Sequence, residues 1–121
     1  MSSTATRSPI VQAYITSALW SSCDDEGIPL DDEKYAGIEI PEETYEKMRA
    51  DVGAFITANA EDLLGMASEQ IGHDLWLTRN GHGCGFFDRG LGERGERLTK
   101  AADALGTQDI YIGDDARLYV M

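Results

Sequence analysis

The residues best suited to chemistry lie in the glycine-rich stretch WLTRNGHGCGFFDRG, residues 76–90. It places His82 two residues before Cys84, with Asp88 shortly afterwards. A thiol beside an imidazole is the arrangement of a cysteine nucleophile with its base, and the same donors can hold zinc. The stretch is therefore compatible with a catalytic loop, a metal site or a tight turn between two buried strands.

The spacing of these residues disfavours a bound metal or nucleotide. Zinc needs three or four ligands at one point, and the other candidates nearby are His73 and Asp74. None of the spacings C-x-x-C, H-x-x-x-H and H-E-x-x-H occurs. The chain also lacks G-x-x-x-x-G-K-[ST], and strands are expected on both sides of the glycines, where a dinucleotide loop needs a strand and then a helix. We therefore expect no metal and no cofactor.

A catalytic role for the cysteine needs more than proximity to a histidine. The thiol needs a lowered pKa and a base oriented by a third group, and the sequence indicates neither. Large apolar side chains in the same stretch, Trp76, Phe86 and Phe87, favour a structural role at the centre of a sheet. The alternative is a small enzyme or metal-binding protein whose pocket gathers His82, Cys84, Asp88 and Arg79.

Charge is the most informative property of the chain. The formal net charge is −12, from 22 acidic and 10 basic residues. Residues 24–46 hold ten of the carboxylates but a single base, Lys34. Such a surface repels nucleic acid and membrane headgroups, and it attracts basic protein surfaces over about a Debye length. The candidate partner-binding residues are Asp24, Asp25, Glu26, Asp31, Asp32, Glu33, Glu42, Glu43 and Glu46.

Length and composition indicate one small globular domain. The 121 residues are 42% apolar, enough for a single two-layer core. Residues 1–8 are expected to form a flexible leader and residues 9–121 the domain. No apolar run approaches the roughly 18 residues of a membrane span. Cys23 and Cys84 are expected to be reduced thiols, buried or half-buried, since two cysteines do not make a disulfide framework.

The first half of the chain predicts helices. Ser8-Pro9 offers a capping hydroxyl and a proline at the first helical position, followed by an apolar face that ends near residues 21–23. A second helix is expected from Pro41, with acids in its first turn, after an acidic loop. Asn59, with Asp62 three residues later, predicts a third helix running toward Gln70.

The second half predicts strands. Residues 74–79, DLWLTR, alternate like a strand and would pair with residues 84–88 in a β-hairpin. A helix is expected over residues 97–105, and QDIYI and ARLYV flank Gly-Asp-Asp as a second hairpin. The predicted fold class is α+β: a helical N-terminal half packed on a small antiparallel sheet of two β-hairpins, in the order α-α-α-β-β-α-β-β.

Three stretches, WLTRNGHGCGFFDRGLG, RLTKAADALG and YIGDDARLYV, resemble a group of small acidic proteins encoded by bacteriophages and other mobile elements. The likeness covers residues 71–120. It implies a phage or mobile-element setting and carries over no catalytic residue. Cys84 stands where the group's pattern has a small residue such as alanine. The acidic half before Ile71 lies outside the resemblance.

Together, charge and resemblance predict a non-enzymatic interaction protein in the cytoplasm of a host bacterium. Duplex DNA carries about one negative charge per 1.7 Å of axis, and fixed carboxylates can occupy a groove built to bind it. The expected partner is a basic host protein, a nucleic-acid-binding effector such as a CRISPR effector or a restriction enzyme, with no direct contact to nucleic acid or membrane. A phage accessory or assembly subunit, oligomerising through an apolar patch, is the remaining alternative.

Overall fold

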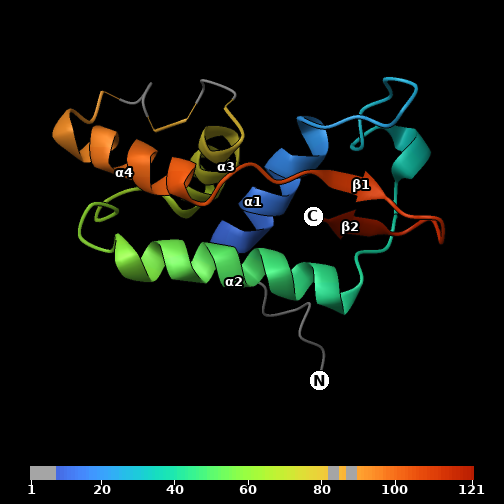
Figure 1. Ribbon diagram of the computed structural model, residues 1–121, viewed down its shortest axis with the longest axis horizontal. Helices are drawn as coiled ribbons and strands as arrows, with labels where there is room; N and C mark the ends of the chain where they lie inside the picture. The colour runs from blue at the N-terminus through green and yellow to red at the C-terminus, as the bar shows by residue number, and fades with distance from the viewer. Residues whose placement is uncertain (1–7, 82–84, 87–89) are drawn as a thin grey trace.

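The computed structural model describes residues 8–81, 85–86 and 90–121. Four α-helices precede a two-stranded sheet: α1 (Pro9–Trp20), α2 (Glu42–Ala58), α3 (Ser68–Arg79), α4 (Glu93–Ala104), β1 (Ile110–Ile112) and β2 (Leu118–Val120). A 3-10 turn, η2 (Glu33–Tyr35), lies between α1 and α2. Figure 1 shows α2 along one side of the molecule, the hairpin beside its first turns, and α3 and α4 toward its other end. The α+β class is confirmed.

The helix α1 begins where the sequence places it. The Ser8 hydroxyl accepts a hydrogen bond from the backbone N–H of Ile10, and Pro9 opens the helix. Its buried face packs along α3, with the rings of Tyr14 and Trp76 edge to face at 5.3 Å between centroids. Helix α2 follows Pro41, with two acids in its first turn, as expected.

The prediction of a strand over residues 74–79 is wrong, because this segment is the second half of α3. The alternating pattern is misleading since every residue from Asp74 to Arg79 is buried, so this half of α3 has no exposed polar stripe. Gly72 lets α3 approach α1 closely: a Cβ there would lie 2.2 Å from the Ile10 carbonyl oxygen. The predicted first hairpin does not form.

Two further boundaries differ from the predictions. Residues 59–65 form turns, and the third helix begins at Ser68, so the Asn59 cap signal marks the end of α2. The Asn59 side chain donates instead to the Phe55 carbonyl, 2.9 Å away. Helix α4 begins at Glu93, before the predicted residue 97.

Of the second expected strand, only Gly85 and Phe86 lie among the described residues, and neither is in a strand. Phe86 is fully buried and stacks on Phe55 at 5.6 Å, while its backbone N–H donates to the Thr78 hydroxyl. Trp76 is also in the core, 2% exposed. The expected structural role therefore holds for these two aromatic residues, on a helix and a turn instead of a hairpin. Phe87 lies outside the described residues, as does the expected leader apart from Ser8.

The second predicted hairpin is confirmed. Strands β1 and β2 pair antiparallel in the register Ile110–Val120, Tyr111–Tyr119 and Ile112–Leu118. Leu118 and Val120 bury their side chains in the core to which all four helices contribute. The buried face of β2 thus anchors the hairpin, and its Gly-Asp-Asp turn lies at the same end of the molecule as the acidic loop (Figure 1).

Candidate functional site

The acidic loop, residues 21–41, is folded around one carboxylate. Asp24 accepts hydrogen bonds from the backbone N–H groups of Glu26 and Ile28, both at 2.9 Å, and from the Tyr35 hydroxyl. The Lys34 ammonium lies 3.6 Å away. These contacts, chiefly the Tyr35 hydrogen bond, lower the pKa of Asp24 to about 2. Of the nine predicted partner-binding residues, Asp24 is the one that is partly buried, and its carboxylate makes the most contacts within the loop.

Backbone pairing fixes the same loop. Cys23 and Pro29 form an isolated antiparallel bridge, and the N–H of Leu30 donates to the Ser22 carbonyl at 3.0 Å. The Leu30 side chain is 2% exposed, so it anchors the loop to the core. The carboxylate of Asp32 caps η2 by accepting from the Lys34 N–H. An irregular acidic segment is therefore held in one conformation.

The other eight predicted residues present their side chains at the surface. They are Asp25, Glu26, Asp31, Asp32, Glu33, Glu42, Glu43 and Glu46. Glu46 is paired with Arg49, whose hydrogen bond lowers the pKa of the carboxyl. Glu42 and Glu43 lie in the first turn of α2, where the helix dipole favours negative charge.

The hairpin is joined to this loop and to α2. The backbone N–H of Leu118 donates to the Glu39 carbonyl at 3.0 Å, and the buried Thr44 hydroxyl donates to the Leu118 carbonyl at 2.8 Å. Arg117 lies 3.3 Å from the Glu39 carboxylate and also pairs with Asp115. These contacts make the loop, the start of α2 and the hairpin turn one continuous structure.

This arrangement adds Asp114 and Asp115 to the acidic surface. Both are exposed in the turn of the hairpin, which lies beside the acidic loop in space although about 80 residues separate them along the chain. In the sequence, Asp114 and Asp115 indicate only a turn. The hydrogen bond between Leu118 and Glu39 brings this turn beside the acidic loop. We call the loop 21–41, the first turns of α2 and the hairpin turn 113–117 the acidic end.

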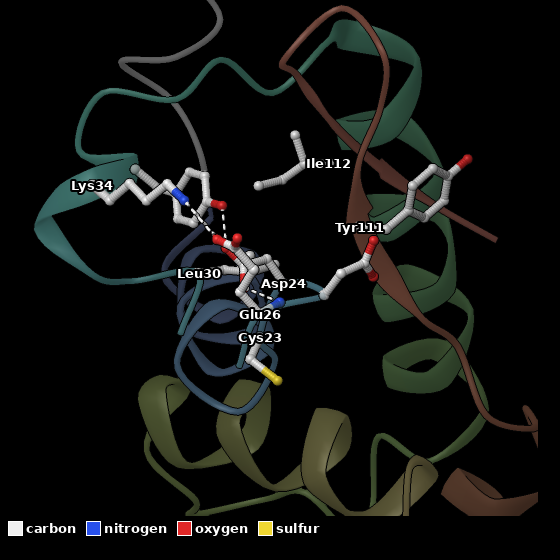
Figure 2. Close-up of a pocket in the computed structure, with 9 residues that line it drawn as sticks. Cys23, Asp24, Glu26, Leu30, Lys34, Tyr111 and Ile112 are labelled. Carbon is white, nitrogen blue, oxygen red and sulfur yellow. Dashed lines mark hydrogen bonds and ion pairs between the residues drawn. The ribbon is translucent and has the colours of Figure 1, made fainter. Parts of the chain in front are cut away.

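A pocket of about 400 Å³ opens between the acidic loop and β1. Figure 2 shows Asp24, Glu26 and Lys34 on its loop side and Ile112 on its strand side. Leu30 forms part of its apolar wall. The pocket thus combines aliphatic surface with an excess of negative charge, a composition suited to a cationic group with an apolar stem.

Cys23 also lines this pocket and is exposed, contrary to the expectation of a buried or half-buried thiol. Cys84 lies outside the described residues.

Three residues of the alternative catalytic or metal site, His82, Cys84 and Asp88, lie outside the described residues. His73 lies 3.2 Å from Asp74 and stacks on Trp20. Within residues 8–81, 85–86 and 90–121, no cluster of three or more His, Cys, Asp or Glu side chains could hold a metal ion.

Arg79, the remaining member of that alternative, is a structural residue. Its side chain is 4% exposed, and the guanidinium donates to Asp51, to the Tyr14 hydroxyl and to the carbonyls of Leu105 and Gly106. Burial raises the pKa of Tyr14 to about 12, so its hydroxyl stays neutral. Arg79 thereby ties α1, α2, α3 and the end of α4 together.

In comparisons with known proteins, no family model, curated protein or solved structure matches the chain. In the described part of the chain, none of the helices has the length and apolar character needed to cross a membrane.

Proposed function

We propose that this chain is a non-enzymatic acidic interaction protein that occupies the basic nucleic-acid-binding surface of a host defence protein, such as a CRISPR effector or a restriction enzyme. The observation that carries the proposal is the acidic end: exposed carboxylates on three segments, held in place by ordered contacts. A mimic of nucleic acid needs fixed negative charges, because a disordered acidic segment loses conformational entropy when it binds. The phage or mobile-element setting comes from the resemblance over residues 71–120.

The kind of contact that fixes this surface also supports binding to a cation. Asp24 accepts hydrogen bonds from neutral donors, two backbone N–H groups and a phenol, which organise the loop. The Lys34 ammonium, 3.6 Å from both Asp24 and Glu26, offsets one of the loop's negative charges. Lys34 is the single base within residues 24–46. A basic partner would therefore meet a potential that the protein's own cations leave largely uncompensated.

The test is capture from a bacterial host lysate with three baits. The first is the natural chain, and the second carries Asp31→Ser, Asp32→Ser and Glu33→Ser, in which serine at 32 retains a cap for η2. The third is a matched control with the same change in charge at the opposite end of the molecule, Glu61→Ser, Glu93→Ser and Glu96→Ser, all exposed positions.

We expect the natural chain and the control to retain the same basic nucleic-acid-binding protein, released at high salt, and the second bait to lose it. Adding the natural chain to the captured protein should displace its labelled nucleic acid. Equal capture by all three baits, or capture insensitive to salt, would contradict the proposal.

A further inference from the structure

Strand β1 has one edge that the hairpin does not use. Asp109 and Met121 exchange two backbone hydrogen bonds, at 3.4 and 3.1 Å, and the N–H of Gly113 donates to Arg117 at 2.8 Å. Hydrogen-bonded pairs alternate along an antiparallel ladder, so odd-numbered residues of this strand face β2. The N–H and C=O groups of Ile110 and Ile112 therefore point away from β2.

Neighbouring contacts bear out this alternation. One step earlier on the same edge, the N–H of Gln108 donates to the Asn80 side chain at 2.8 Å. On β2, the backbone groups of Leu118 point away from β1. Its N–H donates to the Glu39 carbonyl, and its C=O accepts from the Thr44 hydroxyl. Among the described residues, Ile110 and Ile112 make no corresponding backbone hydrogen bond. The outer edge of β2 is thus occupied by the protein itself, whereas that of β1 is open over two residues.

A groove runs beside this open edge. The pocket of about 400 Å³ described above adjoins a second pocket of about 590 Å³, since both are lined by Cys23 and Tyr111. Residues 107–112 form one wall of the two pockets, and residues 21–26 form much of the other. Figure 2 shows Tyr111 and Ile112 projecting to opposite sides of the strand, Ile112 toward the acidic loop.

The groove carries an excess of negative charge. Asp24, Asp25, Glu26 and Asp109 line it, with Lys34 as the one base among its lining residues. A second copy of this chain, pairing β1 to β1, would bring two such acidic walls together, which disfavours that occupant. An extended segment rich in Lys or Arg has both the backbone groups that the edge needs and the charge that the walls attract.

We infer that the open edge of β1 binds an extended basic peptide segment of the partner as an added antiparallel strand. Backbone hydrogen bonds to Ile110 and Ile112 would supply register, and the groove's carboxylates would select cationic side chains. This inference rests on the proposed function and gives the acidic end a specific mode of recognition.

Proline substitution tests the strand pairing separately from the charge. Ile112→Pro removes the outward-facing N–H and leaves the β1–β2 ladder intact, a position where an edge strand accepts proline. Ile112→Val, which retains the N–H, is the matched control. The probe is a ten-residue peptide of alternating lysine and threonine, compared with one of alternating lysine and proline at equal charge.

We expect the lysine–threonine peptide to bind the natural chain and Ile112→Val alike and to slow hydrogen exchange at the amide of Ile112. Ile112→Pro should bind it at least about fivefold more weakly, since a lost backbone hydrogen bond costs about 1 kcal/mol net. The lysine–proline peptide should bind weakly to all three. Thermal unfolding of each variant checks that the domain remains folded.

Equal affinity of the natural chain and Ile112→Pro for the lysine–threonine peptide would overturn the inference, as would no binding of that peptide at all. If the Asp31, Asp32 and Glu33 substitutions still abolish capture of the host protein in that case, the proposed function stands and only the strand pairing fails. The proposed function fails independently, through equal capture by the three baits.

Discussion

The two ends of the molecule hold their acidic residues in different ways. Opposite the acidic end, the turn 59–65 and residues 90–104 carry five acids and three bases. There Arg97 makes two hydrogen bonds to Asp62, at 2.7 and 2.8 Å, and Arg94 donates to the Leu64 carbonyl. At the acidic end the organising carboxylate, Asp24, accepts chiefly from neutral donors. Ion pairs with Lys34, Arg49 and Arg117 also occur there, but they offset only part of a larger number of carboxylates.

This difference separates two uses of charge. Pairing a carboxylate with arginine fixes the chain but cancels the charge, so the end that holds α4 is structurally ordered and electrostatically mixed. Neutral donors fix the chain and leave the charge in place. A surface that must attract a cationic partner needs the second arrangement, which predominates in the acidic loop, where Lys34 is the one base among residues 24–46.

The largest effect is expected in the interior between the two ends, at Arg79. Replacing this buried residue by Met should destabilise the domain by about 3 kcal/mol, because Asp51, the Tyr14 hydroxyl and two carbonyls lose their common donor. Urea denaturation measures the change. A loss below about 1 kcal/mol would show that α1, α2, α3 and the end of α4 are held together by other contacts.

A smaller effect is expected for the link between the hairpin and α2. Thr44→Val keeps the shape of a side chain that is 1% exposed and leaves the Leu118 carbonyl without its donor, which should cost about 1 to 2 kcal/mol. Hydrogen exchange at the hairpin amides should also accelerate more than exchange in α3. Uniform acceleration throughout the domain would contradict a local role for Thr44.

The Asp24 carboxylate gives the acidic end a distinctive pH dependence. Its pKa is about 2 in the folded chain and ordinarily 3.8, so folding favours the ionised form. Its contribution to stability is complete above about pH 5 and is lost as the pH falls through 3.8 toward 2. Asp24→Asn should unfold more readily at pH 7 and show a shallower loss between pH 4 and 2, measured by denaturation at each pH. Parallel pH profiles for the two proteins would exclude this role.

The smallest effect is expected at the opposite end. Arg97→Gln breaks an ion pair whose arginine side chain is 57% exposed, and such pairs contribute about 0 to 1 kcal/mol. The midpoint of urea unfolding of the Arg97→Gln variant should therefore stay close to that of the natural chain. Partner binding should also be unchanged, although the variant is more negative, because the added charge lies away from the acidic end. Tighter binding would indicate that net charge, and not its location, governs recognition.

The sequence predicted the elements whose signals are local. Ser8-Pro9 and Pro41 mark the starts of α1 and α2, and Gly-Asp-Asp marks the second hairpin. It failed at α3, because the second half of this helix is buried on all sides, so it lacks a 3.6-residue polar pattern and can imitate a strand.

The candidate site was predictable only in part. Composition alone gives the acidic residues of the loop, and eight of the nine candidates are exposed as a surface site requires. The inward role of Asp24 depends on a contact eleven residues away, with Tyr35. The addition of Asp114 and Asp115 depends on the pairing of Glu39 with Leu118. Neither contact has a local signature.

The most direct test of the central claim, that the acidic end is the surface a cationic partner recognises, is a titration of the isolated partner with the two triple variants at several salt concentrations. At about 0.5 kcal/mol for each carboxylate, the Asp31, Asp32 and Glu33 substitutions should weaken binding about tenfold at low salt and reduce its salt dependence. The Glu61, Glu93 and Glu96 substitutions should leave affinity within about threefold. Equal losses for the two variants at every salt concentration would contradict the claim.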